Sequence, residues 1–416
     1  MKRFLLIISI ISISGLTFSC KKEKTDNIPG EFQQVNLTEK QKQLINTSNA
    51  FGFEFFKKVS EISGSDANMM VSPLSVSMAL GMTRNGAAGS TLEAMTNTLG
   101  FAGMSETEIN ESYKYIIETF SGLDPKVKLE IANSIWYKNT FVVEQPFILT
   151  NQQYFDASVT KLDFSSPTAV DIINAWVNEK TNTLIPKIID KIPYDAVMYL
   201  INAVYFKGQW RFQFDKAKTQ QKSFYLADGT EVQASAMSEH ESFPYYKGSG
   251  FEAIELPYNQ GNYVMSILLP DAGKNVKDVI AQLSQENWNA WSGKFANRDI
   301  QLQLPKFKYE YEEKQMKPIL SGMGMGVAFD PDNADFTRIN SNGGLYISRV
   351  LHKTFIETNE EGTEAAAVTA VEISYTTAGP DQPYYFTINR PFVYFIEEKS
   401  TGTILFIGTV MNPSLQ

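Results

Sequence analysis

The stretch Glu360-Glu-Gly-Thr-Glu-Ala-Ala-Ala-Val-Thr-Ala370 decides the fold class of this chain. Read with a period of two residues, one face carries no charge from Thr363 to Ile373, and the other carries acids only near its ends. This pattern favours a strand with one face in a core. Alanine is a good helix former and a poor strand former, so a short Ala-rich helix after Gly362 is the competing interpretation. The segment is therefore suited to two states, an exposed loop and a buried strand.

The residues that follow favour the loop-and-strand interpretation. Tyr375 to Pro383 is rich in turn residues, and Phe386 to Ile396 is typical of a strand, with Pro391 inside it. Together with Ile388-Asn-Arg-Pro-Phe392, the region closely resembles the hinge, reactive loop and C-terminal signature of the serpin family.

Other segments extend this resemblance from about residue 38 to the end of the chain. They are Ser72–Leu80, Asn202-Ala-Val-Tyr-Phe-Lys-Gly-Gln-Trp210 and Leu351-His-Lys353. Each motif is weak alone, but together they are specific. The fold class implied is α+β, a single large serpin-like domain with three β-sheets surrounded by about nine helices and an exposed reactive loop.

Capping signals and periodicity indicate the same mixed architecture. Capping boxes at Thr38–Gln41 and Ser105–Glu108 begin helices, and Ser72-Pro73 begins another. The apolar run Ala196–Phe206 predicts a strand buried on both faces at the centre of a sheet. Two further elements are expected, a helix over Glu312–Met323 and a strand over Leu345–Ile356.

The N-terminus has the layout of an export signal. Lys2 and Arg3 precede an apolar run that is too short for a comfortable membrane span. Cys20 is the single cysteine, so it forms no internal disulfide, and its position resembles the lipidation site of a bacterial lipoprotein. A simple cleaved signal with an incidental thiol is the alternative. We expect an exported protein, lipid-anchored to a bacterial membrane and facing the cell exterior or the periplasm.

These features divide the chain into three parts. We expect a signal peptide at 1–19, a lipidated cysteine and flexible tether at 20–37, and a serpin domain at 38–416 whose reactive loop covers about 360–385.

Composition excludes several classes of function. The net charge is −9 and the pI about 5.1, which argues against nucleic acid and anionic membrane surfaces as partners. The chain has two histidines and one cysteine, and it lacks zinc-protease, nucleophile-elbow and phosphate-loop motifs. His352 is better explained as a core histidine, and Glu397-Glu398 as ordinary neighbours that point to opposite sides. We expect no enzyme, metal or cofactor.

The resemblance implies a function. A serpin of this kind is an irreversible suicide-substrate inhibitor of serine endopeptidases, with cysteine endopeptidases as a further class. The protease cuts the reactive loop and forms an acyl-enzyme, and the cut loop inserts into the main β-sheet and traps the ester. We expect a monomer that touches the membrane through its lipid anchor only.

The resemblance also assigns roles to individual residues. The polar cluster beneath the centre of the main sheet, called the shutter, is matched by Ser72, Ser75, Asn202 and His352. The breach, where insertion begins, is matched by Trp210, Lys306 and Glu360. The hinge is matched by Glu360, Gly362, Thr363, Glu364, Ala365, Ala366 and Ala367. Plain core packing or a surface ion pair is the alternative at the shutter and breach positions. The absence of charge and proline from Ala365 to Val371 favours an inhibitory hinge.

The family spacing from Glu360 predicts cleavage between Thr376 and Thr377. The segment from Thr377 to Pro391 is a few residues longer than usual, so Tyr375–Thr376 is the alternative bond. Thr376 would favour elastase-like or subtilisin-like proteases, and Tyr375 chymotrypsin-like ones. No Lys or Arg lies between Glu360 and Arg390, which disfavours trypsin-like targets.

Two other functions compete with inhibition. One is a non-inhibitory serpin that binds a ligand or a protein as a surface lipoprotein. The other discards the family for a carbohydrate- or protein-binding lipoprotein, based on aromatic runs such as Phe243–Tyr246. Those aromatic residues are more simply explained as sheet and loop residues.

Overall fold

The computed structural model describes residues 31–63, 67–363 and 382–415. The expected signal peptide and Cys20 lie outside the described residues.

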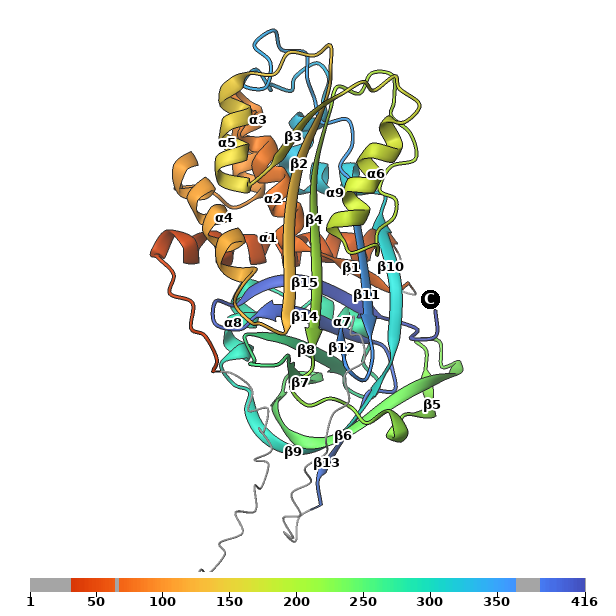
Figure 1. Ribbon diagram of the computed structural model, residues 1–416. Coiled ribbons are helices and arrows are strands. Elements are labelled where there is room, and N and C mark those ends of the chain that lie inside the picture. Colours follow the sequence, from red (N-terminus) through yellow and green to blue (C-terminus); the bar gives the residue numbers. More distant parts are fainter. Residues whose placement is uncertain (1–30, 64–66, 364–381, 416) are drawn as a thin grey trace, which may run out of the picture.

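The described residues form α-helices and β-strands that are interspersed along the chain (Figure 1). The α-helices are α1 (Glu39–Ser63), α2 (Pro73–Arg84), α3 (Gly89–Thr98), α4 (Glu106–Phe120), α5 (Gln145–Phe155), α6 (Ala169–Lys180), α7 (Val276–Ile280), α8 (Gln285–Ser292) and α9 (Met316–Leu320). The predicted capping boxes are confirmed, since Thr38 N donates to Gln41 Oε1 at 2.8 Å and Ser105 N donates to Glu108 Oε2 at 2.8 Å. Ser72 is the N-cap of α2, as predicted, and Pro73 follows it.

One sheet runs lengthwise through the molecule and has six strands in the order β10-β11-β12-β4-β2-β3. Its strands are β2 (Val127–Lys138), β3 (Ser158–Leu162), β4 (Met198–Gln209), β10 (Phe307–Glu313), β11 (His352–Thr358) and the two-residue β12 (Gly362–Thr363). In Figure 1 α6 lies in front of this sheet, while α1 and α2 lie behind its strands.

The other sheet has nine strands in the order β1-β15-β14-β8-β7-β6-β9-β13, with β5 paired to β6. Its strands are β1 (Met69–Val71), β5 (Gln220–Tyr225), β6 (Glu231–Lys247), β7 (Phe251–Pro257), β8 (Tyr263–Pro270), β9 (Ala296–Pro305), β13 (Tyr384–Thr387), β14 (Phe392–Glu398) and β15 (Thr403–Val410). Only Tyr245–Lys247 of β6 pairs with β7. Dividing the network at this short junction gives, with the six-stranded sheet, the three sheets that we predicted.

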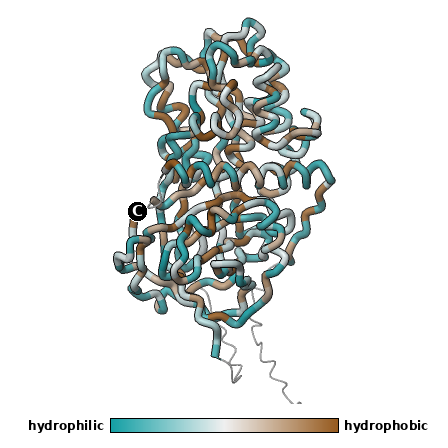
Figure 2. The backbone as a smooth tube through the Cα atoms, turned by 180° about the vertical axis from the view of Figure 1, so that it is seen from behind, coloured by the Kyte–Doolittle hydropathy of each residue, from teal (hydrophilic) through white to brown (hydrophobic). Residues whose placement is uncertain are grey.

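One apolar core joins both sheets and the helices behind them, with buried residues from Val35 to Met411. In Figure 2 hydrophobic stretches run across the middle of the molecule, and hydrophilic residues are common on the outer turns. A second, smaller cluster lies beneath α6, where Ile173 and Val177 pack with Trp136 and Ile201. Helix α6 therefore covers the six-stranded sheet with a core of its own.

The prediction that Ala196–Phe206 is buried on both faces is wrong. Strand β4 begins at Met198, and its burial alternates: Ile201 and Ala203 are buried, whereas Leu200 and Val204 are half-buried. Leu200 and Val204 stay partly exposed because the edge of β4 that faces β11 is largely unpaired. Along this edge, only Gly208 and Gln209 pair with a described strand.

Three other expected elements differ from the structure for similar reasons. The expected strand Leu345–Ile356 forms only from His352, because β10 supplies hydrogen-bonding partners for His352–Thr358 alone. The expected strand Phe386–Ile396 is divided into β13 and β14 around Pro391, which has no N–H to donate. The expected helix Glu312–Met323 begins only at Met316, because Glu312 and Glu313 pair with β11, and beyond Leu320 it continues as a π-helical turn over Ser321–Met325.

Glu397 and Glu398 are more unusual than the sequence indicated, because both side chains are fully buried on β14. Burial raises the pKa of Glu397 to about 8. Glu397 accepts from Trp288 Nε1 at 3.0 Å and lies 3.8 Å from Lys399 Nζ, which also pairs with buried Glu255. Glu398 instead accepts from the backbone N–H groups of residues 400 and 401. One lysine thus lies beside two buried carboxyl groups, and a pKa of about 8 leaves Glu397 largely protonated at neutral pH.

We expect Lys399→Met to lower the free energy of unfolding by about 2 kcal/mol, since it leaves Glu255 and Glu397 buried without a cation. Lys399 keeps some solvent contact, so the expected loss is smaller than for a fully buried pair. Urea unfolding measures it. Lys247→Met is the matched control, because Lys247 is half exposed in its pair with Asp271 and is expected to contribute less than ~1 kcal/mol. Equal losses in the two variants would contradict this assignment.

Candidate functional site

The hinge enters the six-stranded sheet as the short strand β12. Gly362 and Thr363 pair with Gln209 and Gly208 of β4, and Thr363 also pairs with Thr358 of β11. Along the rest of β4, from Met198 to Lys207, the edge facing β11 has no strand partner among the described residues. The hinge therefore occupies the first positions of a strand site that continues along β4.

Gly362 is required by a close approach of two strands. A Cβ atom at this position would lie 1.9 Å from the carbonyl oxygen of Gly208, so a larger residue would push β12 away from β4. Gly362, predicted as a hinge residue, therefore has a packing role in the structure.

Thr363 is held by an aromatic cluster. Its side chain is 3% exposed, and its hydroxyl lies 2.6 Å from the hydroxyl of Tyr258. Tyr258 stacks on Trp210 with ring centroids 4.5 Å apart, and Trp210 Nε1 donates to the carbonyl of Asn359 at 2.9 Å. Trp210 thus lies directly against the hinge, at the end of β4.

Two ion pairs flank the entry of the hinge. Lys306 Nζ lies 2.8 Å from Glu360 Oε2, and Thr219 Oγ1 donates to Glu360 Oε1 at 2.9 Å. Partial burial acts to raise the pKa of Glu360, but the hydrogen bonds from Lys306 and Thr219 outweigh it and hold the pKa below its ordinary value. Lys216 Nζ lies 2.5 Å from Glu361 Oε1. The pair of Lys216 with Glu361 was missed, because no motif in the sequence connects residues so far apart.

His352 is buried and uncharged at the start of β11. Its Nε2 accepts a hydrogen bond from Ser72 N at 3.0 Å, and the Ser72 hydroxyl accepts from Ser75 N at 3.3 Å. Phe55 packs edge-on against the imidazole ring. Burial lowers the pKa of His352 from its ordinary value of 6.5 to about 4. Ser72, Ser75 and His352 therefore form one connected group between α2 and β11.

Asn202 has a different partner from the one expected. Its Nδ2 donates to Asn133 Oδ1 at 2.7 Å, and no hydrogen bond joins it to Ser72, Ser75 or His352 among the described residues. Asn133, on β2, is buried and donates to the carbonyl of Phe155. Asn133 was not among the residues predicted for the shutter. Asn133 was hard to single out, because its strand also contains Lys128, Glu130 and Ser134.

We expect the free energy of unfolding to fall by about 3 kcal/mol as the pH drops from about 6.5 to about 4, because of His352. In this window the unfolded chain binds a proton on the imidazole and the folded chain does not, so acid favours unfolding. Urea unfolding at several pH values measures the slope. The difference in slope between wild type and His352→Gln gives the contribution of His352, since glutamine keeps a hydrogen-bond acceptor and does not titrate.

The control for this pH dependence is His240→Gln, because His240 is exposed on β6 beside Asp299. This variant is expected to keep the wild-type slope. A His352→Gln variant with an unchanged slope would contradict the assignment to His352.

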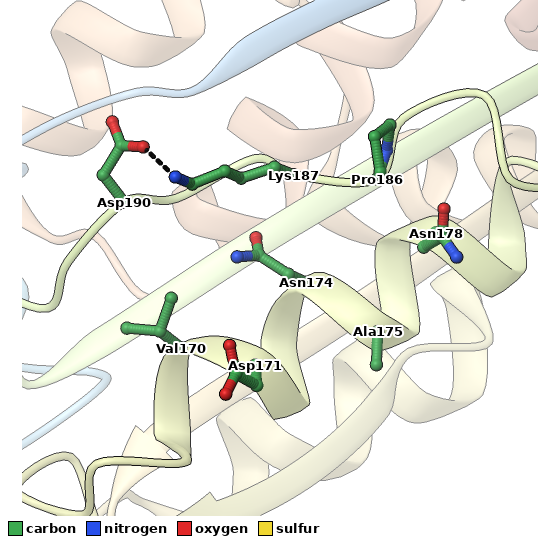
Figure 3. Close-up of a pocket in the computed structure, with 8 residues that line it drawn as sticks. All are labelled: Val170, Asp171, Asn174, Ala175, Asn178, Pro186, Lys187 and Asp190. Carbon is green, nitrogen blue, oxygen red and sulfur yellow. Dashed lines mark ion pairs between the residues drawn. The ribbon is translucent and has the colours of Figure 1, made fainter.

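Helix α6 and the segment after it bridge β4 and β11. The Asn174 side chain donates to the carbonyl of Ile189 at 2.9 Å and accepts from the N–H of Ile188 at 2.9 Å. On the other side, Lys353 Nζ donates to the carbonyl of Lys187 at 3.1 Å. Figure 3 shows the open hollow of about 460 Å³ between α6 and this segment, with Lys187 and Asp190 paired at its rim. A strand added beside β4 has to pass beneath this unit.

The remaining candidate positions lie outside the described residues. These are the hinge residues Glu364, Ala365, Ala366 and Ala367 and the alternative reactive bonds at Tyr375, Thr376 and Thr377. Within the ranges that the structure describes, no helix is both long and apolar enough to cross a bilayer.

Comparisons with known proteins agree with this geometry. The family model described as serpin (serine protease inhibitor) matches residues 46–413. An uncharacterised serpin-like protein of Methanosarcina acetivorans is 32% identical over 432 residues, covering 100% of this chain and 98% of the relative. Among solved structures, the native state of the thermophilic serpin tengpin matches with a TM-score of 0.81 and 36% identity, over 92% of this chain and 97% of tengpin. Human thyroxine-binding globulin matches with a TM-score of 0.82 and 27% identity, over 90% and 100% of the two chains.

Proposed function

Because this chain belongs to the serpin family of serine protease inhibitors, we propose that it is an irreversible suicide-substrate inhibitor of serine endopeptidases and performs no catalytic turnover of its own. One observation carries the proposal: the hinge residues Gly362 and Thr363 already pair with β4 and β11, next to a β4 edge that has no further strand partner among the described residues.

The trapping step follows from this arrangement. The protease serine attacks a bond of the reactive loop, forms an acyl-enzyme and releases the new amino terminus. The loop segment joined to Thr363 then adds to β4 and β11 as a strand, which is the established mode of serpin loop insertion. Adding about ten backbone hydrogen bonds at ~1 kcal/mol each supplies the driving force. The acylated protease is carried along the sheet and is distorted before the ester is hydrolysed.

We propose the bond Thr376–Thr377, with Tyr375–Thr376 as the alternative, and hence elastase-like, subtilisin-like or chymotrypsin-like targets. The absence of Lys and Arg between Glu360 and Arg390 supports this choice, because trypsin-like enzymes require a basic residue. Cysteine endopeptidases form comparable acyl-enzymes and belong in the same test. We propose that the inhibitor acts as a monomer.

The decisive experiment mixes the purified protein with elastase, chymotrypsin or subtilisin and examines the products on a denaturing gel. A band at the summed mass that survives boiling in detergent is expected. Mass spectrometry of the released C-terminal fragment then identifies the bond. If all three proteases, together with a cysteine protease, cut the loop and keep full activity, inhibition by trapping is contradicted.

A second candidate is a non-inhibitory serpin that binds a ligand or a protein. The similarity to thyroxine-binding globulin supports it, since that protein was solved in a complex with thyroxine. Loop cleavage without covalent complex and without a gain in thermal stability would favour this candidate.

We also propose export and lipid anchoring at Cys20, on the basis of the apolar run that precedes this single cysteine. We expect metabolic labelling with palmitate to mark the protein in a lipoprotein-producing bacterium, and Cys20→Ala to release it from the membrane fraction. An unlabelled wild-type protein would contradict lipidation and leave the inhibitory proposal untouched.

A further inference from the structure

A hollow of about 250 Å³ lies on one face of the part of the sheet formed by β5, β6, β9 and β13. The strand register places its lining on the same face: Lys222 is opposite Ala234, Ala236 is opposite Pro305, and Gln303 is opposite Thr387. The hollow thus extends across all four strands.

Small side chains on β6 create the space. Ala234 and Ala236 form the floor, while the buried Phe224 and Pro305 supply apolar surface on β5 and β9. Ligand pockets for drug-sized molecules measure about 300–1,000 Å³. A hollow of about 250 Å³, equal to the liquid volume of about eight waters, fits a molecule of roughly eight to twelve non-hydrogen atoms.

The charged and apolar groups that line the hollow indicate which kind of ligand it would bind. Lys222 is the only charged residue among those that line the hollow, and it has no carboxylate partner within the described ranges. No Asp or Glu lines the site. The amides of Gln303 on β9 and of Asn389, whose carbonyl accepts from Tyr225 N on β5, add polar groups without charge. An ammonium group beside an apolar floor is complementary to a carboxylate with a short hydrocarbon body.

We propose that this hollow is a binding site for a small monocarboxylate, with its carboxylate at Lys222 and its apolar body on Ala234, Ala236 and Phe224. The site is independent of the reactive bond and of protease inhibition.

The position of the site connects it to both ends of the reactive loop. Ser235, between the two floor alanines, accepts from Lys306 N at 2.8 Å, and Lys306 holds Glu360. On the other side, Ile388 N donates to Gln303 O at 2.9 Å, directly after β13. A ligand bound between Ala236, Pro305 and Ile388 lies next to the residues that make these bonds, and occupancy is expected to raise the thermal midpoint of the uncleaved protein by mass action.

The test titrates the full-length purified protein with benzoate and hexanoate by calorimetry. One saturable site per chain with a Kd of about 1 mM or lower is expected, as is typical of so small a ligand. Benzamide and hexanamide, which lack the charge, are expected to bind at least about fivefold more weakly. Absence of saturable binding up to about 20 mM, or equal binding of the amides, would overturn the proposal.

Two variants and one control locate the site. Lys222→Gln is expected to weaken carboxylate binding at least about fivefold, and its exposed position leaves folding unaffected. Ala236→Leu is expected to fill the floor and abolish binding of acid and amide alike. Lys277→Gln, on the exposed side of α7, is the control and is expected to bind as wild type. If Lys222→Gln binds carboxylates as tightly as Lys277→Gln does, the site is elsewhere and the proposal fails.

Discussion

Replacing Thr363 by arginine is expected to turn the protein from an inhibitor into a substrate, with the yield of covalent complex falling ~100-fold or more. Thr363 is already buried in the uncleaved protein, where it is 3% exposed and its hydroxyl lies 2.6 Å from that of Tyr258. An arginine at this position is expected to leave the sheet, so strand addition then has to bury its charge beside Tyr258. A cost of about 2.7 kcal/mol in the barrier to insertion slows that step ~100-fold. Hydrolysis of the acyl-enzyme then precedes trapping.

The yield is measured as the number of inhibitor molecules consumed per protease inactivated. Thr363→Ser is the matched control, because it keeps the hydroxyl that bonds Tyr258 and is expected to change the yield less than ~3-fold. If Thr363→Arg traps the protease at the wild-type yield, strand addition beside β4 is not the trapping step.

The parts of the site that the sequence indicated are those carried by short contiguous motifs. Glu360 belongs to such a motif, and it forms an ion pair at 2.8 Å with Lys306, which the family resemblance assigned to the breach. The caps at Thr38 and Ser105 are local as well, since each depends on a residue three positions further along the chain. Interactions of this kind are encoded in a few neighbouring residues.

The contacts that the sequence analysis missed depend on strand register and on burial. Asn133 meets Asn202 only because β2 and β4 pair antiparallel at this position, and periodicity does not give the register of two distant strands. Glu397 was taken for an ordinary strand residue, because the residues that bury it, Trp288 and Glu255, come from other parts of the chain. Long-range pairing determines both.

The first part of the expected strand Leu345–Ile356, up to Leu351, is wrong for a reason that bears on function. Its apolar pattern suits a strand, yet β11 begins only at His352, where β10 supplies hydrogen bonds. Residues of this segment and of β4, including Leu200, Val204 and Ile347, are only half-buried. A strand added between β4 and this segment would cover these partly exposed apolar side chains. The apolar pattern of Leu345–Leu351 thus fits a six-stranded sheet with an added strand better than the sheet of the uncleaved protein.

Cleavage of the reactive loop is therefore expected to raise the thermal unfolding midpoint by on the order of 10 °C or more. About ten new backbone hydrogen bonds at ~1 kcal/mol each give ~10 kcal/mol, and a chain of this length has an unfolding entropy near ~0.8 kcal/mol per degree. The midpoint is measured by circular dichroism before and after nicking with subtilisin. Thr363→Arg, nicked in the same way, is expected to gain little, because its hinge resists entry beside Tyr258. An equal rise of the midpoint in wild type and variant would mean that the stabilisation arises without strand addition at β4. No rise in either protein would mean that strand addition lacks the driving force on which inhibition depends.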